Sequence, residues 1–178
     1  MEIIFTEIAG CFEIIPKIFT DHRGKFIKPY HIDELKSNGI DLNVKEEYYS
    51  VSHKNVIRGL HFQTPPKAVA KLVTCITGKV LDAVVDLRKN SKTYLKTYIV
   101  ELTEENSKLL YIPEGLAHGF CSLQDNSLLL YMCSEMHSPE NDSGIHWNSA
   151  GIKWPVKNPV VSDKDEALVS MGQFNNPF

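Results

Sequence analysis

The chain has 178 residues, of which 43% are apolar and 23% charged, a composition typical of a globular domain with a sizeable core. A formal charge of −3 without a basic block argues against nucleic acid as a partner. Apolar runs are too short to span a bilayer, so no membrane partner is expected. The acidic N-terminus does not resemble a signal peptide, and four scattered cysteines favour reduced thiols in the cytoplasm.

Short β-like runs bounded by turn residues follow one another along most of the chain. Before them, residues 31–40 predict two helical turns that end at Gly39. The expected strands then lie in residues 48–53, 56–63, 71–88, 97–102, 108–113, 119–123 and 127–136. A hairpin is expected at Thr77–Gly78, because glycine accepts the backbone angles of tight turns. Two further short helices are expected, in residues 102–110 with Thr103 as the cap and in residues 162–172.

The strand that follows Gly78 should present two different faces. One face is apolar and comprises Leu81, Ala83, Val85 and Leu87. The other is mixed, which suits a cavity wall, and comprises Val80, Asp82, Val84, Asp86 and Arg88. Closely spaced strands with few helices predict an all-β fold, an antiparallel jelly-roll sandwich or barrel. No repeat or linker divides the chain, so residues 1–178 are expected to form one domain.

Polar residues interrupt several otherwise apolar segments. They are Arg58, His61, Lys71, His118, Tyr131, Asp163 and Asp165. Because alternate residues of each strand in a small barrel point inward, such distant positions can converge in one cavity.

These residue types together form a set suited to proton transfer. His61 could accept a proton if a carboxylate fixes its tautomer and stabilises the imidazolium. Lys71 and His118 could stabilise an oxyanion, and Tyr131 could return a proton from the opposite side. The set fits proton abstraction beside a carbonyl, formation of an enolate and reprotonation on the other face.

Each residue also has a structural interpretation. His61 taken alone is more often a hydrogen-bonded core histidine, and Lys71 could extend its ammonium from a strand edge to solvent. Tyr131 could be an ordinary buried aromatic residue, and Asp165 could form a capping box with Ser162. A metal-dependent cupin is a further alternative, but the chain has no HxH pair, so no metal site is expected.

Several strings resemble, in the same order, the dTDP-4-dehydrorhamnose 3,5-epimerase family. They run from DHRGKF near residue 21 to VSDKD near residue 165, and include VIRGLHFQ, AKLVTCITGKVLDAVVDLR, YIPEGLAHGF, LLYMCSEMHSP and GIKWP. The resemblance implies a dimeric jelly-roll cupin that needs neither metal nor other cofactor. It implies a nucleotide-diphosphate-linked 4-keto-6-deoxy sugar as substrate, inverted at C3 and C5 in surface polysaccharide or deoxysugar biosynthesis.

The resemblance also implies roles for residues at the matching positions. The base falls on His61, its carboxylate partner on Asp165, the acid on Tyr131 and the enolate-stabilising lysine on Lys71. The residues that match contacts to the diphosphate or the sugar are Arg23, Arg58 and His118. A cupin that only binds a nucleotide sugar is the alternative from a different functional class, and inversion at C3 alone also stays open.

The chain departs from the family pattern at positions assigned to substrate recognition. In RGKFIK, Lys28 stands where the family has glutamate, two residues after Phe26, and Glu46 and Tyr48 replace a glutamine and an asparagine. The further residues expected to bind substrate are Phe26, Lys28, Glu46 and Tyr48. A carboxylate at Glu46 could accept both N1–H and the N2 amino group of guanine. The sequence therefore leaves GDP open beside dTDP as the nucleotide, while a solvated strand-edge position explains Glu46 equally well.

Overall fold

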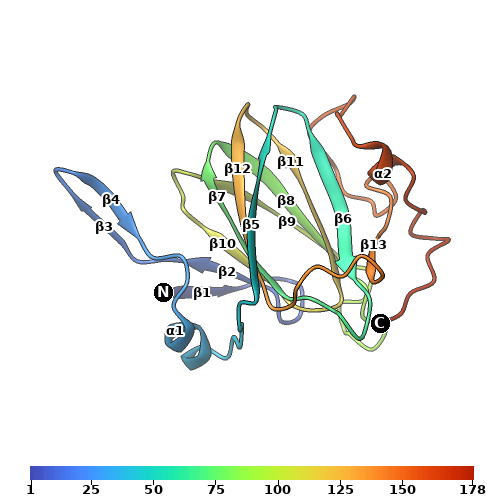
Figure 1. Cartoon of the computed structure of the whole chain (residues 1–178), viewed down its shortest axis with the longest axis horizontal. Coiled ribbons are helices and arrows are strands. Elements are labelled where there is room, and N and C mark those ends of the chain that lie inside the picture. Colours follow the sequence, from blue (N-terminus) through green and yellow to red (C-terminus); the bar gives the residue numbers. More distant parts are fainter.

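The computed structural model describes all residues, Met1–Phe178, and consists mainly of two antiparallel sheets that face each other (Figure 1). The six-stranded sheet contains, in spatial order, β1 (Glu2–Phe5), β2 (Phe12–Ile15), β10 (Leu109–Ile112), β7 (Lys71–Thr77), β12 (Ser127–Cys133) and β5 (Glu46–Ser52). The five-stranded sheet contains β13 (Asp142–Gly144), β6 (Ile57–Gln63), β11 (Leu116–Ser122), β8 (Lys79–Asp86) and β9 (Thr97–Thr103). The predicted antiparallel all-β fold is confirmed.

The remaining elements are small. A two-stranded hairpin of β3 (Ile18–Asp21) and β4 (Gly24–Ile27) projects away from the sheets (Figure 1). The helices are α1 (Ile32–Ser37) and α2 (Asp163–Glu166), both inside the ranges expected from the sequence. Neither reaches the length and apolarity that a membrane-crossing helix requires.

The alternation of side chains along the strands separates three apolar clusters. Val80 and Val84 of β8 belong to the central cluster between the sheets. Ala83 and Val85 point the other way, into a cluster covered by the C-terminal segment. The separation of the two faces predicted for β8 is therefore confirmed, but no residue of the mixed face lines the cavity described below. A third cluster packs α1, through Leu35, against the outer face of the six-stranded sheet.

The prediction of a hairpin at Thr77–Gly78 is wrong, because the two strands that flank this turn do not pair with each other. The chain does turn at Gly78, whose φ is 79°. However, β7 pairs with β10 and β12, whereas β8 pairs with β9 and β11. The turn carries the chain from one sheet to the other, and a local turn signal does not specify which strands accept the hydrogen bonds.

The helix predicted in residues 102–110 is also wrong. Strand β9 continues to Thr103, and a tight turn leads into β10 at Leu109. In that turn Thr103 and Asn106 each accept a hydrogen bond from the backbone N–H of the other, at 3.0 and 3.1 Å. Leu109 and Leu110 bury their side chains on opposite faces of a sheet, which outweighs the helical tendency of the preceding residues.

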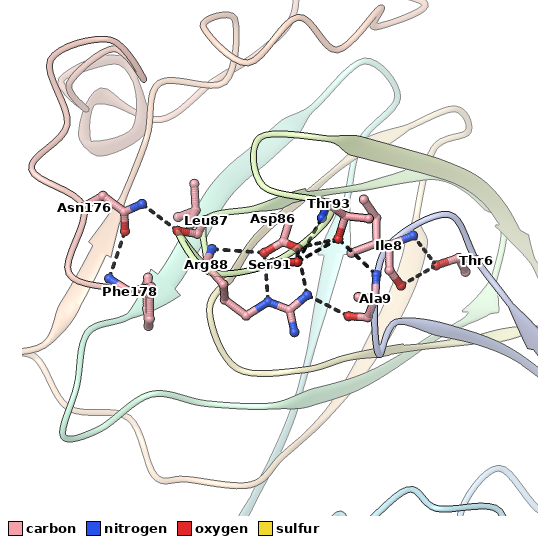
Figure 2. Close-up of polar contacts among 10 residues, drawn as sticks. All are labelled: Thr6, Ile8, Ala9, Asp86, Leu87, Arg88, Ser91, Thr93, Asn176 and Phe178. Carbon is pink, nitrogen blue, oxygen red and sulfur yellow. Dashed lines mark hydrogen bonds and ion pairs between the residues drawn. The ribbon is translucent and has the colours of Figure 1, made fainter.

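The end of β8 is tied to the N-terminal segment by a buried carboxylate (Figure 2). Asp86 accepts hydrogen bonds from Arg88 Nε at 2.8 Å, Ser91 Oγ at 2.6 Å and Thr93 Oγ1 at 2.7 Å. Arg88 also donates to the carbonyl of Ala9 at 2.7 Å. Burial acts to raise the pKa of Asp86, but these hydrogen bonds outweigh it and hold the pKa at about 2. The network is therefore a source of stability remote from the cavity described below.

Candidate active site

A cavity of about 600 Å³ opens between the two sheets. Strands β5, β7 and β12 supply one wall, and β6 and β11 supply the other, with the start of α2 at the rim. The cavity is lined by these residues with predicted site roles: Glu46, Tyr48, Arg58, His61, Lys71, His118, Tyr131 and Asp165. Side chains that lie up to 119 positions apart in sequence, Glu46 and Asp165, thus meet in one place.

A bulge in β6 brings Arg58 and His61 to the same wall. Residues three apart in a regular strand point to opposite faces. Here His118 of β11 pairs with His61 while Phe120 pairs with Arg58, so β6 contains one extra residue between the two pairs. Gly59 lies in this bulge with φ of 135°, and a Cβ there would come within 2.6 Å of the Gly119 Cα. Glycine at both positions allows the close approach that turns both side chains inward.

His61 forms a dyad with Asp165. The two are joined by a 2.7 Å hydrogen bond between His61 Nε2 and Asp165 Oδ1. An ionised carboxylate only accepts, so Nε2 carries the proton and Nδ1 presents a lone pair. Burial acts to raise the pKa of Asp165, but the bonds from His61 and from the Gly59 N–H, at 3.1 Å, outweigh it and lower the pKa. The dyad therefore has the arrangement of an oriented general base.

Asp165 also lies in the first turn of α2, where a capping role was the structural alternative. The Ser162 hydroxyl accepts a hydrogen bond from the Asp165 N–H at 3.2 Å, which caps the helix. The Asp165 carboxylate does not complete a capping box, because its two oxygens bond His61 and Gly59. The cap instead holds the carboxylate in place against the imidazole.

Lys71 places the ammonium of a buried side chain on the opposite wall. Its Nζ makes no hydrogen bond or ion pair with the protein, although the side chain is buried and lines the cavity. Burial lowers its pKa, against the raising influence of Cys133, Asp142 and Asp82. Nζ is not among the fully buried polar atoms that lack a partner, so it opens onto the cavity, where it suits an anionic or strongly polarised ligand oxygen. The interpretation of Lys71 as a solvent-extended lysine does not fit this burial.

Tyr131 lies on the same wall as Lys71 and faces the His61 wall. Strand β12 pairs Tyr131 with Val73 of β7 and with Tyr48 of β5. The phenol is only 6% exposed, and burial raises its pKa well above the ordinary value. Its ring meets the His118 ring edge-on, with 6.0 Å between centroids. His61 and Tyr131 therefore approach one cavity from the two different sheets.

His118 is held by a second buried carboxylate. Its Nε2 lies 3.0 and 2.9 Å from the two oxygens of Asp82, and both residues are buried. With Nε2 engaged, Nδ1 is the polar atom left for a ligand. The sequence marked Asp82 only as a polar residue on the mixed face of its strand, and its pairing with His118 became visible only in the fold.

The edge strand β5 supplies a polar stripe. Glu46, Tyr48 and Ser50 alternate along its inner face and line the cavity. The Ser50 hydroxyl is buried without a hydrogen-bond partner, and no sequence signal distinguished it. Arg58 reaches this strand from the other sheet, where its Nε donates to Ser52 Oγ at 3.1 Å.

Glu46 is engaged with the protein. Its Oε2 accepts a 2.6 Å hydrogen bond from the backbone N–H of His137. Oε1 and a second lone pair of Oε2 stay available, so this contact does not decide between the two nucleotides.

Three predicted substrate-binding residues do not reach the cavity. Arg23 and Phe26 lie on the projecting β3–β4 hairpin, and Lys28 follows it, all exposed. Arg23 is ion-paired with Asp21 at 2.6 Å beside a separate surface hollow. Within a single chain these three residues do not join the other predicted site residues, because the hairpin projects away from the sheets (Figure 1). No group of three or more histidine, cysteine or acidic side chains is arranged to hold a metal ion.

The comparisons with known proteins agree with this geometry. The profile of the dTDP-4-dehydrorhamnose 3,5-epimerase family matches residues 5–173. A dTDP-4-dehydrorhamnose 3,5-epimerase of Shigella flexneri is 42% identical over 168 residues, 93% of each chain. A dTDP-4-dehydrorhamnose 3-epimerase of Streptomyces niveus is 37% identical over 93% of this chain and 82% of its own.

The fold is equally similar to solved structures. The 3,5-epimerase of Bacillus anthracis, determined with TDP and PPi bound, superposes with a TM-score of 0.93 at 36% identity, covering 96% of this chain and 99% of that one. The chain belongs to the dTDP-4-dehydrorhamnose 3,5-epimerase family.

Proposed function

We propose that the protein inverts C3 and C5 of a dTDP-linked 4-keto-6-deoxy sugar through an enolate. The observation that supports this most directly is the pair His61 and Tyr131, which face one cavity from opposite sheets beside the unpaired Lys71 ammonium. A sugar ring between the two walls would present one face to an oriented base and the other to a phenol.

The reaction is a proton transfer in two halves. His61 Nδ1 takes the proton from C3, and the C3–H electrons form the C3–C4 double bond as the C4 carbonyl electrons move to oxygen. Lys71 stabilises that enolate oxygen, while Asp165 stabilises the imidazolium. Tyr131 then protonates C3 from the opposite face as the carbonyl re-forms. Because the same ketone acidifies C5, the same groups can serve the second inversion once the ring has shifted, His61 has released its proton to solvent and Tyr131 has taken one up from solvent.

Substrate binding outside the sugar involves the basic side chains. Arg58 and His118 are proposed to contact the diphosphate and the sugar, in keeping with their places on the cavity wall. The thymine nucleotide is favoured over guanine, because the relatives are named for dTDP sugars. We place the enzyme in the cytoplasm, as its four cysteines are free thiols.

We further propose a homodimer in which the β3–β4 hairpin reaches the partner's cavity. All four residues of β3 are exposed, including Phe19 at 61%, and an isolated two-stranded hairpin is marginally stable in water. A second chain would cover the exposed aromatic side chains of this hairpin. It would also bring Arg23, Phe26 and Lys28 to a nucleotide that they cannot reach in their own chain.

The test is NMR of the reaction in heavy water with dTDP-4-keto-6-deoxyglucose. Deuterium is expected at C3 and C5 of the inverted product, because each proton returned comes from groups that exchange with solvent. Label at C3 alone would indicate a C3-epimerase. Binding by calorimetry without deuterium at either carbon would refute an enolate route and favour a protein that only binds nucleotide sugars.

A further inference from the structure

Tyr48 covers the face of the proposed acid. It is the direct cross-strand partner of Tyr131, and the two rings stack with centroids 4.6 Å apart and planes 18° apart. On the opposite side Tyr131 has Val73 of β7 as its neighbour, and His118 meets its edge. The phenol of Tyr131 is thus confined on three sides, and Tyr48 is the side contributed by the edge strand.

The stack between Tyr48 and Tyr131 involves a residue of an edge strand that is only partly buried. Tyr48 is 42% exposed, whereas Val73 is fully buried in the central cluster. A half-exposed ring at the end of a sheet contributes less apolar burial to the fold than a core residue does. Tyr48 nevertheless lines the cavity, and its stack on Tyr131 is the contact that holds its ring there.

We propose that Tyr48 is a positioning residue that acts through Tyr131, an inference that rests on the proposed function. A tyrosine has two rotatable side-chain bonds, and the stacked ring restricts the rotation that would move the Tyr131 hydroxyl along the cavity. Tyr48 thereby fixes the hydroxyl at the point from which the enolate is protonated. Removal of the Tyr48 ring should leave abstraction by His61 intact and slow the return of the proton from the other side.

Removal of the Tyr48 ring should change how the enolate partitions between returned substrate and inverted product. An enolate that is not protonated by Tyr131 regains a hydrogen on its original face from the His61 imidazolium, which gives back the substrate. In heavy water this returned substrate carries deuterium when the imidazolium exchanges its proton with solvent before the return. The ratio of labelled substrate to inverted product therefore reports the position of the acid, independently of the amount of folded enzyme.

The experiment compares Tyr48→Phe, Tyr48→Asn and Tyr49→Asn with the wild type in heavy water. Tyr49 is the adjacent residue of the same strand, is 65% exposed and does not line the cavity, so its variant controls for loss of an aromatic ring from the edge strand. Aromatic pairs of this kind predict a rise of about two- to tenfold in the ratio for Tyr48→Asn. Tyr48→Phe keeps the ring and should keep the wild-type ratio.

The outcomes separate the possibilities. An unchanged ratio in Tyr48→Asn, or an equal rise in Tyr49→Asn, would overturn the positioning role. A rise in Tyr48→Phe as large as in Tyr48→Asn would also overturn it, since the hydroxyl and not the stack would then be responsible. Failure of the wild type to incorporate deuterium at all would instead refute the proposed function, and is seen before any variant is compared.

Discussion

Replacement of Asp165 by asparagine should abolish the base without removing the hydrogen bonds around it. The Gly59 N–H lies 3.1 Å from one carboxylate oxygen and can only donate, so the amide oxygen of an asparagine must face Gly59. The amide NH₂ then faces His61 Nε2, which sits 2.7 Å from the other oxygen and must accept. The proton of the imidazole is thereby moved to Nδ1, the nitrogen that the bond to Asp165 leaves free.

The size of the effect follows from this change of tautomer. A histidine whose Nδ1 carries the proton cannot take another from C3, and it also loses the carboxylate that stabilises the imidazolium. An equivalent aspartate-to-asparagine change in a serine protease lowers turnover about 10⁴-fold through the wrong tautomer. We expect a loss of about 10³- to 10⁴-fold in the rate of deuterium exchange at C3. The melting temperature should move by only a few degrees, because the side chain keeps its shape and two hydrogen bonds.

The assay is exchange at C3 by NMR together with a thermal melt. Asp163→Asn is the matched control, since Asp163 is exposed in the same turn of α2 and makes no contact with His61. A variant Asp165→Asn that exchanges within tenfold of the wild type would show that the carboxylate does not set the tautomer of the base.

Three further results are expected. Lys71→Met should lower turnover about 10²- to 10³-fold through loss of enolate stabilisation. The melting temperature should stay the same or rise, because an apolar side chain replaces a cation that burial desolvates and no protein group pairs, and a large loss of stability would contradict this. Asp86 has a pKa of about 2 in the folded protein and an ordinary pKa of 3.8 in the unfolded chain. It therefore stabilises the fold fully above pH 3.8 and progressively less as the pH falls towards 2. Asp86→Asn should therefore cost about 2 kcal/mol in urea unfolding at pH 7, with a gap to the wild type that narrows below pH 3.8. Mixing Arg23→Ala chains with His61→Asn chains should restore activity that neither has alone, whereas an Arg23 that acts within its own chain would restore none.

Much of the architecture could be predicted because strand alternation is a local property. The two faces of β8 follow from the order of Val80, Asp82, Ala83 and Val84, and the fold class follows from the spacing of such strands. The pairing of strands could not be predicted in the same way. The turn at Gly78 is visible in the sequence, but the choice between pairing within one sheet and crossing to the other depends on segments far away.

The candidate site was predictable in composition and unpredictable in geometry. The spacing of Arg58 and His61 places them on opposite faces of a regular strand, and only the bulge at Gly59 brings them together. The partnership of His118 with Asp82 depends on register between β11 and β8. The position of Arg23 away from the cavity is also non-local, because the residues next to it in sequence do not determine where its hairpin projects.

The central claim is that His61 and Tyr131 act on opposite faces of one sugar ring. It is tested most directly by NMR in heavy water of the two variants His61→Asn and Tyr131→Phe with the 4-keto substrate. His61→Asn should place no deuterium at C3, whereas Tyr131→Phe should label C3 of the recovered substrate and form little inverted product. Undiminished inversion in Tyr131→Phe, or full labelling in His61→Asn, would contradict the account.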